Sequence, residues 1–189
     1  MRPTREQANE NRNRIIETAS RLFRENGIHA VGVDAVMKGA GLTHGGFYGH
    51  FKSKDDLTTA AVGHALRQSL RAEPESMSLE EFISAYLSKD HRDAVGDGCA
   101  VAALGPELAR LSGGQRASVT DYVRARIARM EKMENHAHGS SDRGKAIADL
   151  SSLLGALIMA RAVDDEELSD EILSETGLSL LRREESGSG

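Results

Sequence analysis

The residues from 41 to 54 carry the most specific chemical pattern in this chain, GLTHGGFYGHF followed by KSK. Gly45 and Gly46 stand where a stable isolated helix would have Ala or Leu, and each helical Gly costs about 1 kcal/mol against Ala. Their lack of side chains allows a bulky partner to approach the backbone closely. Tyr48 and His50 then remain free to face that partner. A short helix of this kind suits a DNA major groove, where its first residues meet base edges and phosphates.

The residues around this pattern are expected to position it. The hydroxyl of Thr43 can cap the short helix by accepting from N–H groups of its first turn. The rings of Phe47 and Phe51 are expected to turn inward. The sequence therefore predicts a recognition helix with an anchored inner side and a polar outer side.

The charges are distributed unevenly along the chain. Residues 1–54 hold nine Lys/Arg and five Asp/Glu, whereas the rest of the chain holds fifteen and twenty-four, within a net charge of −5. A basic head on an acidic body indicates an anionic partner for the head alone. Ordinary variation in surface charge is the alternative explanation for this excess of positive charge in residues 1–54.

Composition narrows the class of protein. The 189 residues are 39% hydrophobic and 28% charged, as in ordinary globular proteins. The single cysteine, Cys99, excludes an internal disulfide and suits a reducing cytoplasm. No apolar run approaches the ~20 residues of a membrane span, and the polar N-terminus does not have the pattern of a signal peptide. We therefore expect a cytoplasmic protein with no membrane partner.

The first part of the chain predicts a helix-turn-helix head over residues 9–69, with its motif at about 32–51. Apolar residues at helical spacing from Ile15 to Phe23 predict a first helix that ends at Asn26-Gly27. A short second helix over 34–38 and a tight turn over 39–41 precede the recognition helix. Ser53 and Asp56 form a capping-box-like pair that starts a connecting helix running to about Arg71.

The remainder predicts a helical effector-binding and dimerisation body over residues 75–183, and so an all-α protein of about nine helices. A capping box at Ser78 starts the body, and residues 99–111 are expected to be helical in two pieces meeting near Pro106. A long helix starts at Gly113-Gly114, and a polar loop covers 135–141. Two helices, 142–163 and 165–181, precede a tail at 184–189 that should be disordered.

The penultimate helix is apolar nearly all round from Leu153 to Ala160, so it must be covered on both sides. Since helix-turn-helix proteins commonly bind palindromic sites as dimers, a two-fold interface is the expected cover. An internal helix in a monomer is the alternative. The predicted interface residues are Leu150, Leu153, Leu154, Leu157 and Ile158.

Residues 9–69 resemble the TetR/AcrR family of bacterial transcriptional regulators. The resemblance rests on these residues in order: Asn26-Gly27, Gly41-Leu42-Thr43, Phe47-Tyr48, His50-Phe51, Lys54 and Leu57. It implies an all-α dimer with one DNA-binding head per subunit, and an effector pocket in the body whose occupancy releases the operator. The residues that it implies at DNA are Thr43, His44, Gly45, Gly46, Tyr48, His50 and, at phosphate, Lys54. Val33 stands where many members have a Thr that opens the second helix and contacts the DNA backbone. The resemblance therefore does not carry this phosphate contact over to Val33, and Asp34 is the alternative cap of the second helix.

The effector candidates lie in the body. Cys99 stands at a predicted helix N-terminus, where the helix dipole favours the thiolate, so it is either a redox or electrophile sensor or a buried core residue. Phe82, Tyr86 and Tyr122 are the aromatic residues of the body. With few aromatics and no Trp, the body is expected to take a small or alkyl-bearing effector.

No metal site, cofactor or enzymatic activity is predicted. The histidines His91, His136 and His138 have no metal-ligand spacing, and Gly113-Gly114 lacks the Lys-Ser/Thr of a phosphate-binding loop. The predicted function is a ligand- or redox-responsive regulator, a repressor that binds a palindromic operator as a dimer. The alternative is a helix-turn-helix module regulated by a protein partner, without a small-molecule pocket.

Overall fold

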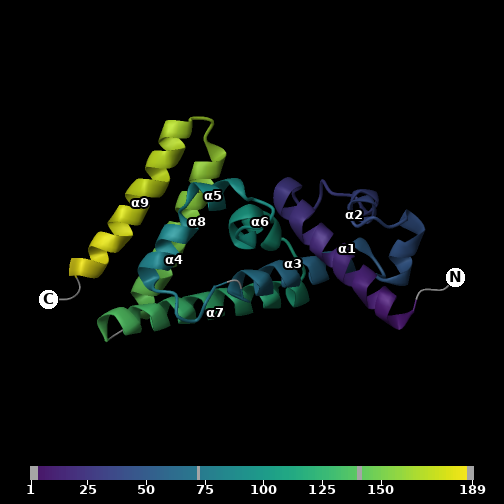
Figure 1. Ribbon diagram of the computed structural model, residues 1–189, viewed down its shortest axis with the longest axis horizontal. Coiled ribbons are helices and arrows are strands. Elements are labelled where there is room, and N and C mark those ends of the chain that lie inside the picture. The colour runs from purple at the N-terminus through teal and green to yellow at the C-terminus, as the bar shows by residue number, and fades with distance from the viewer. Residues whose placement is uncertain (1–3, 72, 140–141, 187–189) are drawn as a thin grey trace.

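The computed structural model describes residues 4–71, 73–139 and 142–186, and this part of the chain forms nine α-helices, one 3₁₀ helix and no strand. The predicted all-α fold is confirmed. Figure 1 shows an elongated molecule with the N-terminal helices at one end, α8 and α9 at the other, and α6 between them. No helix in the described ranges is long and apolar enough to cross a membrane.

The first helix, α1 (Arg5–Asn26), has defined signals at both ends. The Thr4 hydroxyl accepts from the Gln7 N–H, and the Gln7 side chain accepts from the Thr4 N–H, which completes a capping box. Gly27 ends the helix with φ 86°, a conformation that side chains disfavour, and its N–H donates to the Phe23 carbonyl. The predicted stop at Asn26-Gly27 is confirmed.

Three short segments complete the head. Helix α2 (Val33–Gly39) is followed by a turn in which Gly41 has φ 67°, then by the 3₁₀ helix η1 (His44–Gly49) and by α3 (Lys54–Arg71). The Ser53 hydroxyl accepts from the Asp56 N–H at 3.1 Å, as predicted for a cap. The Asp56 carboxylate accepts from the N–H of Lys52 at 3.1 Å, one residue before the partner that a standard capping box would have.

The body consists of six helices. They are α4 (Leu79–Tyr86), α5 (Lys89–Asp93), α6 (Ala100–Leu108), α7 (Gly113–His138), α8 (Arg143–Ala162) and α9 (Glu166–Ser186). The predicted capping box at Ser78, with Glu81, is present at the start of α4.

Three expected boundaries in the body were wrong. Residues 100–108 form one helix across Pro106 rather than two pieces. Pro106 removes only one hydrogen-bond donor from the helix, and the helical pattern resumes after it, since the Ala109 N–H donates to the Gly105 carbonyl at 3.2 Å. The loop expected over 135–141 is helical to His138 and ends at Gly139 with φ 70°. Helix α9 continues to Ser186, past the expected start of the tail at 184, whereas 187–189 and also 140–141 lie outside the described residues.

Two apolar cores meet in the middle of the molecule. The first fills the head and continues into the body, since Ala100, Leu104 and Leu108 of α6 are buried in it. The second lies between α4, α7, α8 and α9. Val101 of α6 and Val123 of α7 pack against both cores. Helix α6 is therefore one structural link between head and body.

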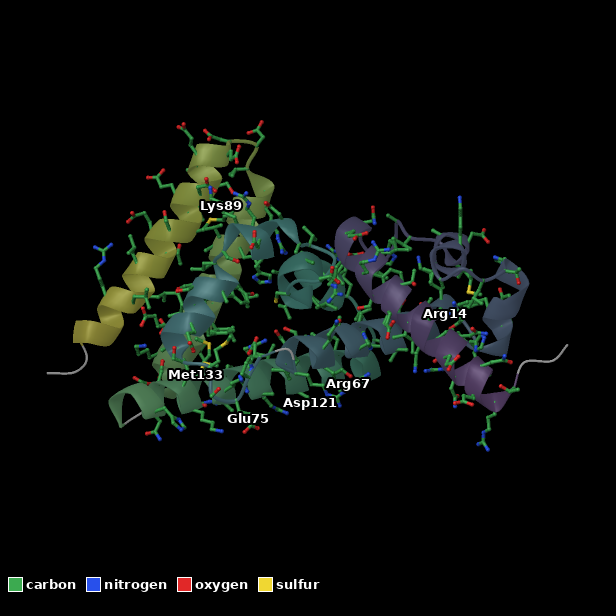
Figure 2. The ribbon with its side chains drawn as sticks, viewed as in Figure 1. Arg14, Arg67, Glu75, Lys89, Asp121 and Met133 are labelled. Atoms are coloured by element: carbon green, nitrogen blue, oxygen red, sulfur yellow. The ribbon has the colours of Figure 1, made fainter. Side chains whose placement is uncertain are left out.

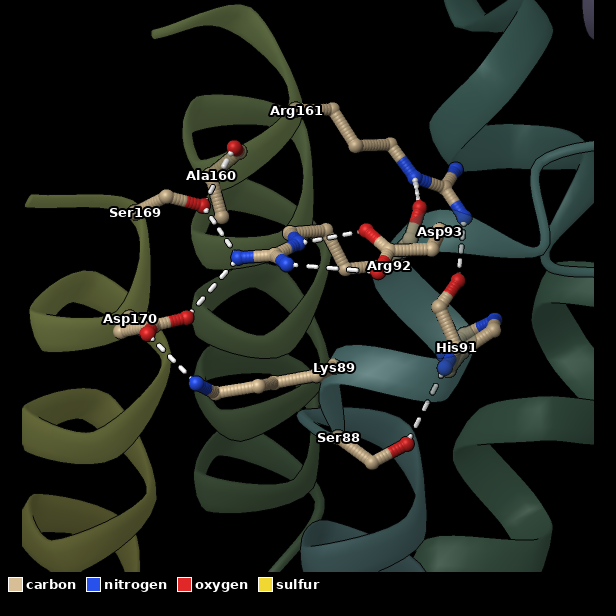
Figure 3. A network of polar contacts seen from close by, with 9 residues as sticks. All are labelled: Ser88, Lys89, His91, Arg92, Asp93, Ala160, Arg161, Ser169 and Asp170. Carbon is tan, nitrogen blue, oxygen red and sulfur yellow. Dashed lines mark hydrogen bonds and ion pairs between the residues drawn. The ribbon is translucent and has the colours of Figure 1, made fainter. Parts of the chain in front are cut away.

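A polar network fastens the short helix α5 to α8 and α9 (Figure 3). The Arg92 guanidinium donates to Ser169 at 3.0 Å and to Asp170 at 2.9 Å, and Lys89 pairs with Asp170 at 2.6 Å. From α8, Arg161 donates to the carbonyls of His91 and Arg92 at 2.7 and 2.9 Å. These bonds hold α5, which precedes the loop leading to α6, against the α8–α9 hairpin.

Candidate nucleic-acid interface

The inner side of η1 is anchored by aromatic rings. Phe47 and Phe51 are buried, and their rings stack with centroids 5.8 Å apart. Tyr48 contacts Phe47 edge-on at 5.2 Å and is nevertheless 72% exposed. The guanidinium of Arg12 lies over the Phe51 ring at 4.7 Å. As predicted, the rings of Phe47 and Phe51 fix the helix and leave the Tyr48 phenol facing outward.

The glycines of η1 have no explanation within the chain. A Cβ at Gly45 or Gly49 would meet nothing within 4 Å, and at Gly46 it would make ordinary contacts with Met37 at 3.7 Å and Thr43 at 3.9 Å. None of the three has a positive φ. Neither packing nor backbone conformation requires glycine here, so the close approach of an external surface to this backbone stays a prediction.

Two expectations about the start of this motif were wrong. The segment is a 3₁₀ helix, and Thr43 occupies its N-cap position without a side-chain hydrogen bond. In the tighter turn, the Gly46 N–H donates instead to the Thr43 carbonyl at 3.0 Å. Asp34 does not cap α2, because its carboxylate contacts the ring Nδ1 of His44.

The remaining predicted DNA contacts surround this surface. Thr43, His44, Gly45 and Gly46 are exposed and His50 is half-buried. Lys54, expected at phosphate, directs its ammonium to the His29 carbonyl at 3.4 Å. Lys38 and Lys52, which the sequence analysis did not single out, are exposed cations of the same head. The contacts of all these residues with DNA stay predictions.

The four effector candidates of the body lie inside it. Phe82, Tyr86 and Tyr122 are buried, and Cys99 is 3% exposed at the N-cap of α6. The glycines before Cys99 do not expose it. They bring the chain close to its neighbours, because a Cβ at Gly98 would lie 2.9 Å from the His91 ring.

His91, for which the sequence indicated no role, fixes the segment around Cys99. Its Nδ1 lies 2.7 Å from the Tyr86 carbonyl, and its Nε2 accepts from the Cys99 N–H at 3.1 Å. This arrangement defines a neutral ring with the proton on Nδ1. Burial lowers the pKa of His91, because the charged ring would lose water and would turn two donors toward each other. Burial also raises the pKa of the Tyr86 phenol, and the thiol of Cys99 beside it adds to the effect.

A buried ion pair that no sequence pattern indicated crosses the body. The Arg126 guanidinium, 1% exposed, donates to both carboxylate oxygens of Glu73 at 2.6 and 2.5 Å, and to the Tyr122 hydroxyl at 3.3 Å. Burial opposes the charge of Arg126, but Tyr122 and Glu73 outweigh burial and raise its pKa. The two partners are 53 residues apart in the chain, so only the fold brings them together.

An apolar groove of about 370 Å³ lies between α6 and α7. Val101, Leu108, Val119 and Val123 form much of its wall, with Arg116 and Arg124 also lining it. This groove lies where the two cores meet. Among the described residues, no group of three or more His, Cys, Asp or Glu could hold a metal ion.

The predicted dimer residues fall into two groups. Leu150, Leu153 and Leu157 are buried within the subunit, so their assignment to an interface was wrong. Leu154 is half-buried and Ile158 is 44% exposed. The exposed apolar residues that accompany Ile158 on α8 and α9 are Ile147, Met159, Leu168 and Leu178.

In the described residues, the short helix α2, the tight turn at Gly41 and η1 follow one another in the order of a helix-turn-helix motif. Residues 15–61 match the family described as bacterial regulatory proteins, tetR family. This match assigns the N-terminal module of the chain to that family.

Two curated relatives match the N-terminal part of the chain. AcrR of Shigella flexneri, a transcriptional regulator, is 41% identical over 56 residues, covering 30% of this chain and 26% of AcrR. YerO of Bacillus subtilis, an uncharacterised regulator, is 31% identical over 99 residues, covering 46% of this chain and 34% of YerO. The match thus spans between a quarter and about a third of these relatives.

Solved structures share the fold over nearly the whole chain. SCO4454, a TetR-family regulator from Streptomyces coelicolor, superposes with a TM-score of 0.69 at 23% identity, covering 93% of this chain and 96% of that chain. A TetR-family regulator from Agrobacterium tumefaciens gives 0.75 at 19% identity, covering 93% and 98%. The reduced form of E. coli NemR gives 0.70 at 18% identity, covering 90% and 95%.

Proposed function

We propose that this chain is a dimeric transcriptional repressor that binds a palindromic operator through η1 and leaves it when an effector binds the body. The observation that carries the proposal is the surface of η1, where Tyr48 faces outward beside glycines that nothing in the chain requires. Its relatives AcrR and YerO are named as regulators of transcription. With chromosomal DNA as its partner, the protein would act in the cytoplasm.

The DNA-binding part of this proposal can be tested without knowing the operator. Selection from a random duplex library by the purified protein should yield a palindromic site. Binding to that site, followed by fluorescence anisotropy, should weaken steeply with salt, because each neutralised phosphate releases counterions. Tyr48→Ala should abolish binding while the circular dichroism spectrum stays unchanged. The affinity of Tyr48→Phe, which lacks only the hydroxyl, measures the contribution of that group to binding. Wild-type affinity in Tyr48→Ala would show that η1 is not the recognition helix.

The dimer is proposed to form through the exposed apolar residues of α8 and α9. Two copies of this surface, related by a two-fold axis, would cover Ile158 and its neighbours and would pair two heads for a palindrome. Ile158→Glu should give monomers by light scattering, because a carboxylate would be buried without a partner. Ala128→Glu, at an exposed position on α7, is the matched control. A dimeric Ile158→Glu variant would reject this surface.

The effector is proposed to occupy the apolar groove between α6 and α7. The aliphatic wall suits a small or alkyl-bearing molecule. Helix α6 also contacts the head, because the Glu107 carboxylate accepts from the N–H groups of Ile28 and His29 at 2.9 and 3.3 Å. An effector that moves α6 would therefore disturb these bonds. A screen by thermal shift should find ligands whose effect is lost when Val119→Trp fills the groove.

A redox signal is the second form that the effector could take. NemR, whose fold is similar, has been solved in a form called reduced. In this chain the Cys99 thiol is buried, so an oxidant or electrophile would have to reach it through local opening of the segment before α6. Loss of operator binding after treatment with a quinone, absent in Cys99→Ser, would support this route, and an equal response in both proteins would reject it.

The alternative function is a helix-turn-helix module whose body docks a protein partner. The same apolar residues of α8 and α9, on an acidic body, favour this reading if the purified protein is monomeric. Light scattering therefore separates the two proposals. A dimer in which Ile158→Glu disrupts assembly supports the repressor, and a stable monomer that binds DNA supports the module.

A further inference from the structure

A second cavity, which shares no lining residue with η1 or with the apolar groove, lies between α1 and α3. Figure 1 shows these helices crossing in the head and diverging toward the body. The cavity has a volume of about 600 Å³ and is lined by the last three turns of α1, the last two turns of α3 and Asp97. Nearly all of its lining side chains are charged or polar, unlike the groove between α6 and α7.

Its charge is predominantly positive. Arg21 and Arg24 from α1 and Arg67 and Arg71 from α3 line it, against two carboxylates, Glu17 and Asp97. Arg21 is also paired with Glu25 at 3.0 Å, outside the lining. No hydrogen bond or ion pair is found for Arg67 and Arg71 within the described residues, so both guanidinium groups are available to a ligand.

Arg24 is the least expected of these residues. It is 5% exposed, yet its only hydrogen bond within the described part of the chain is a long one, from Nη1 to the Gly98 carbonyl at 3.3 Å. Its buried Nε has no partner there. A buried guanidinium normally has its donors satisfied, because each unpaired donor loses its bonds to water without replacement. The chain itself encloses this Nε, so a ligand would act instead on the charge of Arg24: an anion in the cavity that Arg24 lines would offset a guanidinium charge that the chain leaves poorly paired.

We propose that this cavity binds a small phosphate-bearing anion, held by Arg24, Arg67 and Arg71. The planar fork of each guanidinium matches the oxygens of a phosphate, and arginines from two helices can bind separate phosphate oxygens. The volume accommodates a diphosphate or a small phosphorylated metabolite. The side chains of Gln68 and Thr18, also in the lining, supply neutral hydrogen-bonding groups for the rest of the molecule.

The position of the cavity distinguishes this ligand from the phosphates of operator DNA. The residues of α3 that line the cavity lie between His64 and Arg71, in the C-terminal half of this helix. The residues near η1, in contrast, precede α3 or lie at its start. A bound anion would bridge the head helix α1 to the part of α3 that enters the body. The site therefore differs from the proposed effector groove and does not depend on it.

Pyrophosphate is the probe that tests this site, with inorganic phosphate as the smaller comparison. Isothermal titration of the full chain at about 0.15 M salt, without DNA, should show one pyrophosphate site per chain with Kd below about 1 mM. Arg67→Ser should weaken binding about tenfold or more by removing an exposed guanidinium without disturbing the core. Arg24→Met should weaken it further, but this variant of a buried residue could also impair folding.

The matched control is Arg14→Ser, an exposed arginine on α1 outside the cavity; Figure 2 shows it on α1 and Arg67 on α3. Equal weakening in Arg14→Ser and Arg67→Ser would indicate general attraction to a basic surface and would overturn the proposal, as would the absence of binding. A non-specific duplex added in excess separates the two phosphate sources. Unchanged pyrophosphate binding supports a small-molecule site, whereas competitive loss would assign the cavity to DNA phosphates.

Discussion

Replacing Glu107 by alanine tests whether α6 holds the head in place. Its carboxylate is the acceptor for the N–H of Ile28 at 2.9 Å and of His29 at 3.3 Å, in the loop that follows Gly27. Ile28 is buried, so its N–H would have little access to water if the carboxylate were absent. The two bonds therefore join the end of α6 to the turn between α1 and α2.

The loss of unfolding free energy expected in Glu107→Ala follows from the type of hydrogen bond that is removed. A hydrogen bond to a charged group contributes about 1.5–3 kcal/mol, and because Glu107 is partly exposed we expect about 1.5–2 kcal/mol for Glu107→Ala. For a chain of this length the melting temperature should fall by about 3–8 °C. Amide exchange at Ile28 should accelerate about 10- to 30-fold, since each 1.4 kcal/mol is about tenfold in a local opening equilibrium.

Calorimetry and amide exchange by NMR measure these two effects, and two variants calibrate them. Glu107→Gln keeps a neutral acceptor and should lose about half as much stability. Asp121→Ala removes an exposed acid of α7 and should change neither quantity measurably. An unchanged melting temperature together with unchanged exchange at Ile28 would show that the head does not depend on Glu107, and the proposed route from effector groove to head would fail with it.

Four further outcomes follow from the structure. Gly27→Ala should destabilise by about 1–3 kcal/mol in chemical denaturation, because its φ of 86° disfavours any side chain and a Cβ would approach Glu107 at 3.3 Å; a neutral effect would contradict the backbone assignment. Leu157→Ala should cost about 2–5 kcal/mol through a cavity in the subunit core while leaving the oligomeric state unchanged by light scattering. The Cys99 thiol should react with maleimide far more slowly in the native protein than in urea, and similar rates would show it to be accessible. Stability should fall as the pH drops below about 6.5 toward the lowered folded pKa of His91, since the unfolded chain then binds a proton that the folded chain does not; His91→Gln should flatten this part of the pH profile.

The head could be predicted from the sequence because local signals decide it. Asn26-Gly27 ends α1, Gly41 supplies the positive φ of the turn, and Ser53 caps α3, each through bonds to residues a few positions away. The rings of Phe47 and Phe51, expected to turn inward, likewise predicted that Tyr48 faces outward. Local signals did not distinguish a 3₁₀ helix from an α-helix in this segment, because the two differ by a single hydrogen-bond register.

In the body, the tertiary structure decided what the sequence left open. Helix α8 is apolar on nearly all sides, so its pattern could not separate Leu157, which the subunit's own core covers, from Ile158, which it leaves exposed. The glycines before Cys99 could equally expose a thiol or admit a close neighbour, and the position of the His91 ring determined which. Arg126 and Glu73 meet only because α7 crosses the segment after α3. A chain specifies its turns and caps through neighbouring residues, but burial and long-range pairing depend on which surfaces the other helices cover.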